Sequence, residues 1–273
     1  MKLRVVVGIA LLEITSVFGL SCRSHGPETE TAPEQPTMTS EADRVAAADR
    51  VAAADQLYSQ REDLSRVRMC IAELRQARIA DYGNYEVAWK LSRAAYYLGE
   101  HTTDETEREK AFREGSDLGK IAVQLDSNKP EGHFWLGANY GGAAKHSTLA
   151  GLSTVEDIRK EMEAVLKIDE TYQGGSAYLA LGQLYLQAPR LLGGDYQKAI
   201  EYLEKGLKFG SGNAMLRLRL AEAYEDTNRH SDARKQIDEI LKMTPDSNYL
   251  PEYKEAVDQA KKLMEKIDRS QKS

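Results

Sequence analysis

The sequence has few of the residues on which cross-linked, metal-binding or catalytic protein classes depend. It contains only two cysteines among 273 residues, too few for a disulfide framework. Its five histidines form no H-x-x-x-H pair and no cluster with cysteine, so the sequence predicts no zinc site. It also lacks a glycine-rich phosphate loop and a nucleophile elbow. We therefore expect no catalytic residue, no cofactor and no metal, and a function other than catalysis.

Neither sign of charge dominates the sequence. The 37 basic and 43 acidic residues are interspersed and leave a net charge of −6, so nucleic acid is not an expected partner. Apolar residues make up 41% and charged residues 29%, which is ordinary for a globular protein. The length allows one or two domains with a substantial core.

Long apolar runs are scarce too, and the clearest one lies at the N-terminus. Two basic residues in MKLR precede VVVGIALLEITSVFGLS, which ends in small residues before Cys22. This layout is typical of a secretory signal over residues 1–22. The stretch GLSC resembles a bacterial lipobox, which implies that Cys22 is lipidated. Gly19 replaces the usual aliphatic residue and Glu13 interrupts the run, which leaves an ordinary secreted or anchored protein as the alternative.

The residues after this cysteine predict a tether and then a folded domain. Residues 23–43 are rich in proline, glutamate, threonine and serine, which favours a disordered tether. We expect a lipid-anchored protein that faces the periplasm, and Arg23 after the cysteine favours the outer membrane by analogy with other lipoproteins. Cys70 lies on the apolar side of the helical pattern MCIAELRQA and is predicted to be a buried structural thiol.

From about Ala46 onward the sequence shows helical periodicity and no convincing alternating strand pattern. The segments HFWLGANY, YLALGQLY and RLRLAEAY each contain leucine, a small residue and, three residues later, tyrosine. Each is followed by a second amphipathic helix. A helical pair that recurs with this pattern resembles the tetratricopeptide repeat, or TPR. We therefore predict an all-α, right-handed solenoid of four to five helix pairs with a C-terminal cap helix.

The repeat register divides the helical domain, residues 44–270, into successive units. They lie near 51–85, 86–129, 130–174, 175–213 and 214–247, with the cap helix over 251–269. Glycine or alanine at the eighth position of a unit lets the two helices of a pair approach closely. Surplus residues at 100–109, 141–156 and 188–194 are predicted between the two helices of their units. Either these insertions stack along one rim of the solenoid and form a candidate functional edge, or they are three unrelated loop expansions.

A more specific pattern covers residues 131–241. It comprises FWLGANYGGAAK, IRKEMEAVLKIDETYQGGSAYLALGQLY and PRLLGGDYQKAIEYLEKGL. These segments are similar to the T component of TRAP transporters. The resemblance implies a periplasmic helical-repeat lipoprotein associated with sodium-driven solute uptake, with a concave channel or pocket and frequent self-association. It covers about 110 of the 273 residues, and the final unit departs from it.

The first helix of each pair is expected to form the concave face of the solenoid. Its register predicts a largely apolar surface with a few polar groups, which is typical of a groove for a small ligand or a partner helix. The predicted binding residues are Val87, Lys90, Tyr97, Phe134, Leu179, Gln183, Leu186, Met215, Leu218 and Glu222. The alternative is that some of these side chains belong to the core, covered by the N-terminal helix or the insertions.

Two functions fit these observations. The first is a non-catalytic accessory component of TRAP-type solute uptake that binds a small hydrophobic or amphipathic ligand on its concave face. The alternative is a TPR scaffold that mediates protein–protein interaction with an envelope partner. A bound small molecule favours the first function, and an empty groove with a co-purifying protein favours the second.

Overall fold

The computed structural model describes residues 39–146 and 151–270, and in these ranges every regular element is a helix. The predicted signal peptide and Cys22 lie outside the described residues, as does most of the predicted tether. The α-helices are α1 (Glu41–Tyr58), α2 (Leu64–Ala80), α3 (Tyr85–His101), α4 (Glu105–Leu125), α5 (Pro130–Lys145), α6 (Gly151–Ile168), α7 (Ser176–Gln187), α8 (Tyr196–Phe209), α9 (Ala214–Asp226), α10 (His230–Lys242) and α11 (Leu250–Ser270). Two short 3-10 helices, η1 (Arg190–Leu192) and η2 (Ser247–Tyr249), precede α8 and α11.

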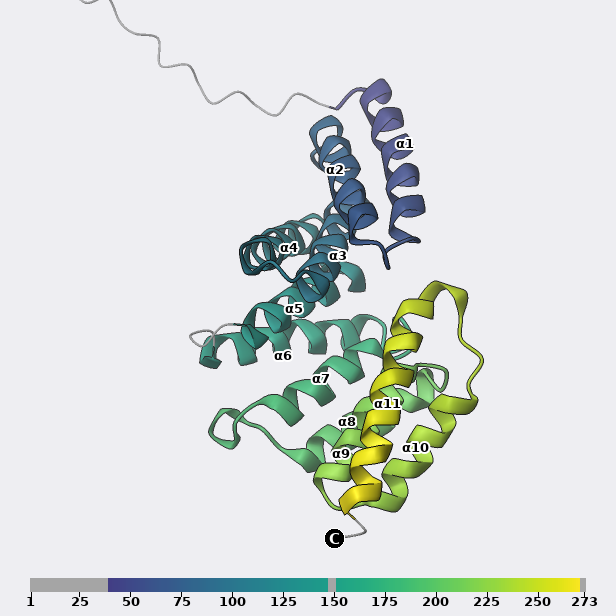
Figure 1. The fold of residues 1–273 in the computed structure, drawn as a ribbon. Coiled ribbons are helices and arrows are strands. Elements are labelled where there is room, and N and C mark those ends of the chain that lie inside the picture. Colours follow the sequence, from purple (N-terminus) through teal and green to yellow (C-terminus); the bar gives the residue numbers. More distant parts are fainter. Residues whose placement is uncertain (1–38, 147–150, 271–273) are drawn as a thin grey trace, which may run out of the picture. The chain divides into compact units, whose positions relative to one another are not determined.

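The helices form five consecutive antiparallel pairs, α1/α2 to α9/α10, and α11 packs on the last pair (Figure 1). This arrangement confirms the predicted all-α solenoid of helical hairpins with a C-terminal cap helix. No helix in the described ranges combines the length and the apolar character that crossing a lipid bilayer requires.

Close contact within the pairs depends on the small residues that the repeat pattern predicted. A Cβ atom on Gly182 of α7 would lie 2.5 Å from Cγ of Leu203 on α8. A Cβ on Gly137 of α5 would lie 2.6 Å from Cε of Met162 on α6. Ala221 of α9 occupies the equivalent position and is fully buried. In the α5/α6 and α7/α8 pairs the second helix therefore packs directly against the backbone of the first.

The turn before α8 shows how the chain reverses between the helices of one pair. Gly193 has a φ of +94°, a backbone conformation that glycine adopts without strain. A Cβ on Gly194 would lie 1.8 Å from the carbonyl oxygen of Ala188, so this position accommodates only glycine. Asp195 then caps α8, because its Oδ1 accepts hydrogen bonds from the backbone N–H groups of Gln197 and Lys198 at 2.9 and 3.2 Å.

The other two surplus segments differ from the prediction that they lie between helices. Residues 105–109 form the first turns of α4, and residues 141–145 extend α5. The cause in α4 is Asp104, whose side chain accepts hydrogen bonds from the N–H groups of Thr106 and Glu107 and starts the helix early. In the described ranges most of this surplus therefore lengthens helices, whereas residues 188–194 form a wide turn.

The core consists of three clusters that follow one another along the chain. The first joins α1 to α4, the second is centred on α5 to α7, and the third joins α8 to α11. Cys70 of α2 is buried in the first cluster, as predicted, and burial raises the pKa of its thiol to about 11. The thiol is therefore protonated near neutral pH and has a packing role.

Candidate binding surface on the inner face

The first helices of the later pairs and the cap helix together line a pocket of about 330 Å³, which we call the inner pocket. Its lining residues are Gln183, Leu186 and Gln187 of α7; Arg219, Glu222, Glu225 and Asp226 of α9; and Leu263 and Lys266 of α11. Three of the predicted binding residues, Gln183, Leu186 and Glu222, thus come together in one place. The repeat register could not indicate the contribution of α11, because that helix lies beyond the last unit.

The inner pocket combines a small apolar surface with dense charge. The Arg219 guanidinium donates to both carboxylate oxygens of Glu222 at 2.8 Å, and its Nε is buried without a hydrogen-bond partner among the described residues. Lys266 donates to Glu225 at 2.8 Å. Partial desolvation, with the neighbouring carboxylate of Glu225 as a smaller cause, raises the pKa of Asp226 above its usual value, although the residue keeps an exposed surface. The pocket can therefore offer both hydrogen-bond donors and acceptors to a bound molecule.

The predicted residues at the N-terminal end of the inner face lie in the core instead. Val87 is fully buried, and Tyr97 is only 6% exposed, in the cluster that joins α3 to α1 and α2. Lys90 is also buried, and its Nζ lies 2.5 Å from a carboxylate oxygen of Asp55 and 2.5 Å from one of Glu86. The α1/α2 pair covers this side of α3, which is the covered arrangement that the sequence left open.

The remaining predicted residues divide between core and partial exposure. Leu218 of α9 is fully buried, whereas Leu179 of α7 and Met215 of α9 are half-buried against the same C-terminal cluster. Phe134 of α5 is 8% exposed and packs edge-to-face on Trp135, with ring centroids 5.0 Å apart. Among the ten predicted residues, those of α7, together with Met215 and Glu222, therefore present accessible surface.

An aromatic wall on α3, formed by Trp89, Arg93 and Tyr96, was missed by the sequence prediction. These residues are spaced by four and three positions and so share one helix face, about one position from the predicted one. The Arg93 guanidinium stacks 3.9 Å from the ring centroid of Tyr58 and 5.0 Å from that of Trp89. The W-x-x-x-R-x-x-Y spacing was visible in the sequence, but only the packing of α1 on α3 shows which face remains open.

Charges from the C-terminal helices act on this aromatic wall. Burial is the main cause that raises the pKa of Tyr96 above its usual range. The carboxylates of Glu100 and Glu255 also raise it, and the guanidinium of Arg219 lowers it. Glu255 belongs to α11 and Arg219 to α9, so both helices contribute to the electrostatic environment of α3.

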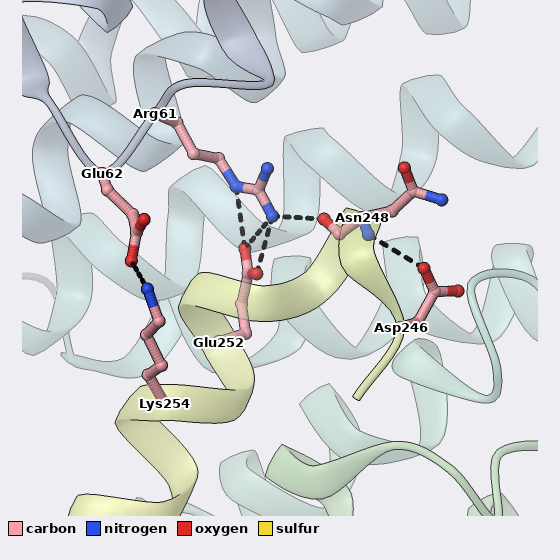
Figure 2. Close-up of polar contacts among 6 residues, drawn as sticks. All are labelled: Arg61, Glu62, Asp246, Asn248, Glu252 and Lys254. Atoms are coloured by element: carbon pink, nitrogen blue, oxygen red, sulfur yellow. Dashed lines mark hydrogen bonds and ion pairs between the residues drawn. The ribbon is translucent and has the colours of Figure 1, made fainter. Parts of the chain in front are cut away.

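A clasp of ion pairs joins the α1/α2 turn to the start of α11 (Figure 2). Arg61, with a side chain 7% exposed, donates to both carboxylate oxygens of Glu252 at 2.7–3.1 Å and to the backbone carbonyl of Asn248 at 2.6 Å. Lys254 donates to Glu62 at 2.8 Å. Repeats of a solenoid contact mainly their neighbours, so an ion pair between residues 191 positions apart is unusual. The clasp links the first pair to the cap helix.

The inner face has the chemistry of a recognition surface. Within the described ranges, no three histidine, cysteine, aspartate or glutamate side chains are placed to hold a metal ion. The inner pocket and the aromatic wall instead provide apolar and aromatic surface beside charged hydrogen-bonding groups, which is typical of a binding site.

The five helical pairs, each stacked on the next, define a TPR-type solenoid protein. The chain belongs to the TRAP transporter T-component family, whose model matches residues 72–269, or 198 of the 273 residues. It is therefore a TRAP-associated TPR protein. The match also includes α3 and α4, which lie before the region where the sequence resemblance was recognised.

Solved structures support the same fold. A thermophilic TPR protein of Thermus thermophilus is similar over 78% of this chain and 99% of its own, with 20% identity and a TM-score of 0.59. PilF of Pseudomonas aeruginosa is similar over 84% of this chain and 93% of its own, with 17% identity and a TM-score of 0.54. No protein with a curated description matches the chain in sequence.

Proposed function

We propose that this protein serves TRAP-type solute uptake by holding a small amphipathic molecule on its inner face. The observation that carries the proposal is the inner pocket, in which residues of α7, α9 and α11 converge on a volume of about 330 Å³. Leu186 and Leu263 offer apolar contact there, and Arg219 and Gln183 offer hydrogen bonds. No chemical step is needed for this role.

The clasp supports the proposal because it bears on how a ligand reaches this surface. Arg61 and Glu252 hold the first pair against the cap helix that forms one side of the inner pocket. A ligand that enters between these ends has to separate a buried guanidinium from its carboxylate, which costs free energy because the guanidinium is left without a partner. We therefore propose that the clasp prolongs the residence of a bound molecule.

We further propose that the protein works at the periplasmic side of the bacterial envelope, held by lipid on Cys22. Family membership supports an envelope location, since a TRAP component acts with a transporter. The signal-like N-terminus and the lipobox-like residues before Cys22 support export and anchoring. Radiolabelled palmitate should enter the wild type and should not enter Cys22→Ala. Absence of label from the wild type would remove the anchor from the proposal.

Native mass spectrometry of the full chain, purified from the cells that produce it, tests the binding role. We expect an added mass of a few hundred daltons or less, the size of a molecule that fits the inner pocket. Leu186→Arg places a long charged side chain in the pocket and should abolish the added mass. Leu241→Arg, at a 43% exposed position of α10 outside the pocket, is the matched control and should retain it.

The same experiment distinguishes the scaffold alternative. A chain that carries no added mass and instead co-purifies with another protein in a defined ratio would support a scaffold. An added mass that persists in Leu186→Arg would show that the molecule binds elsewhere and would contradict the inner pocket as the site.

A further inference from the structure

A second concave surface, which we call the outer groove, lies between α2 and α4. Its volume is about 570 Å³. It is lined by Arg75, Arg78, Ile79 and Tyr82 from α2 and the turn after it, by Leu91 of α3, and by Lys110, Arg113, Glu114, Asp117, Leu118 and Ile121 of α4. It shares no lining residue with the inner pocket.

A regular series of contacts joins α2 to α4, and the outer groove begins where that series stops. Arg68 binds Glu107 with an Nε–Oε1 distance of 2.7 Å, and seven residues further along each helix Arg75 binds Glu114 at 2.8 Å. Residue numbers increase in the same direction on both sides, so α2 and α4 run parallel. Seven residues further still, Tyr82 and Ile121 stand where a third ion pair would lie. At the C-terminal ends of α2 and α4, the contact between the two helices therefore has no ion pair corresponding to the two before it.

The outer groove is apolar at its base and uncovered at its edge. Leu91 and Leu118 are buried beneath it, with exposed fractions of 1% and 7%. Ile79 and Tyr82 line it with 76% and 68% of their surface exposed. Large apolar side chains with this exposure beside a groove are typical of a contact surface for another molecule.

The rim of the groove has an excess of positive charge. Four basic and two acidic residues line it, a local balance of +2 in a chain whose net charge is −6. Arg75 and Glu114 bind each other, and Asp117 binds Lys120 at 3.2 Å. Arg78, Lys110 and Arg113 have no acidic partner among the described residues, although Arg78 stacks over the ring of Tyr82 at 4.1 Å. Three cations around an apolar base are thus available to an acidic ligand.

We propose that the outer groove docks an acidic amphipathic helix of a partner protein. A groove between two parallel helices suits a third helix, which would place apolar side chains on Leu118 and Ile121 and carboxylates near Lys110 and Arg113. A membrane surface is flat and would meet only the exposed rim, whereas a single helix can enter the groove and reach Leu118 and Ile121 between α2 and α4. This docking site is independent of ligand binding at the inner pocket, where acidic residues outnumber basic ones.

A random peptide library displayed on phage and selected against the full chain tests the proposal. Enriched peptides, made synthetically and labelled with fluorescein, are titrated by fluorescence anisotropy. We expect them to combine glutamate or aspartate with leucine, isoleucine or aromatic residues. Lys110→Glu with Arg113→Glu should raise the Kd about tenfold or more, because rim charges that attract the peptide become repulsive. Ile79→Asp should weaken the same peptides without altering any paired charge.

The matched control is Lys261→Glu with Lys262→Glu, an equal charge change at two exposed positions of α11 outside the groove. It should leave the Kd nearly unchanged. Circular dichroism establishes that each variant keeps its helical content. Equal binding to all variants, selection of peptides without acidic residues, or no enrichment would overturn the proposal. So would groove-dependent binding of phosphatidylglycerol vesicles in place of peptide, since that outcome identifies a lipid surface.

Discussion

Leu179 and Leu218 occupy the same position of consecutive repeat units, yet only one of them is fully buried. Leu218 of α9 has no exposed surface and belongs to the cluster that also contains Ala256 and Ala260 of α11. Leu179 of α7 is half-buried at the edge of that cluster. The two leucines share residue type and register, so the difference comes from the cap helix that packs on α9.

This comparison teaches that an inner-face position is accessible only where no further element covers it. The same holds at the N-terminal end, where α1 and α2 cover Val87 and Lys90. On α3 the residues Trp89, Arg93 and Tyr96 are partly exposed instead, and Trp89 and Tyr96 pack against the cluster centred on α5 to α7. A repeat register gives the direction of a side chain relative to its own pair, and the neighbouring elements determine what that side chain meets.

The largest effect is expected for truncation of the buried leucine. Leu218→Ala should lower the free energy of unfolding by about 2–5 kcal/mol, because it leaves a cavity in a well-packed cluster. Leu179→Ala removes less buried surface and should cost about 1–2 kcal/mol. Urea unfolding followed by circular dichroism measures both. Equal losses would contradict the difference in burial and the role of α11.

The next effect concerns packing inside a pair, which does not depend on the covering elements. Gly182→Ala introduces a methyl group 2.5 Å from Cγ of Leu203 and should cost about 1–3 kcal/mol through overpacking. Gly83→Ala, in the turn before α3, meets no atom within 4 Å and serves as the control. It should change the free energy of unfolding by less than about 0.5 kcal/mol. A tolerated Gly182→Ala would show that α7 and α8 separate easily.

A comparable effect is expected when the link between the two ends is broken. Glu252→Ala leaves the buried guanidinium of Arg61 without its carboxylate and should cost about 1–3 kcal/mol. Lys254→Ala breaks the exposed pair of the clasp and should cost less than about 1 kcal/mol. Hydrogen exchange should quicken in α1 and α11 of Glu252→Ala. If exchange changes in α11 alone, the clasp does not couple the ends.

The clasp can be tested further with a double-mutant cycle. Arg61→Met combined with Glu252→Ala should cost less than the sum of the single changes, because the double variant has no unpaired buried charge. Additive losses would show that the ion pair contributes nothing beyond its separate side chains.

The smallest effect is a pH dependence in the middle pair, away from both ends. His133 forms a hydrogen bond with Glu161, with 2.6 Å between Nδ1 and Oε2. This bond raises the pKa of His133 above the usual value of 6.5. The stabilisation of the folded state by protonated His133 is thus fully present below pH 6.5, the pKa of this side chain in the unfolded chain. It is lost as the pH rises through the higher pKa of His133 in the folded state. Unfolding free energies at about pH 6 and about pH 9 should therefore differ in the wild type and differ less in His133→Gln. An identical difference in both proteins would contradict this role.

Much of the fold was predictable from the sequence because its determinants are local. Gly137, Gly182 and Ala221 recur before a tyrosine at a fixed offset, and this pattern predicted helical pairs in close contact. Asp195, which directly follows two glycines in the sequence, caps the start of α8. By contrast, Asp104 starts α4 inside a segment expected to be a loop, since a capping side chain competes with a loop in a way that repeat length does not reveal.

The candidate site was predictable only in part, for a physical reason. Gln183, Leu186 and Glu222 follow from the register of α7 and α9, whereas Arg219 and Lys266 enter the inner pocket through the packing of α11. The outer groove depends on Tyr82 and Ile121, which lie in different pairs and have no shared sequence pattern. Contacts between units depend on the angle at which the pairs stack, and helical periodicity does not encode that angle directly.

Local chemistry in the sequence was thus sufficient to determine the class of the protein, the helical pairs and the small residues at which each pair closes. Tertiary packing alone decided that Arg61 meets Glu252 across 191 residues, that α11 covers Leu218, and which faces of α3 and α7 stay open. The reason is that helix propensity, capping and periodicity act between residues a few positions apart in the sequence. The accessibility of a side chain depends instead on all the elements that pack against its surface.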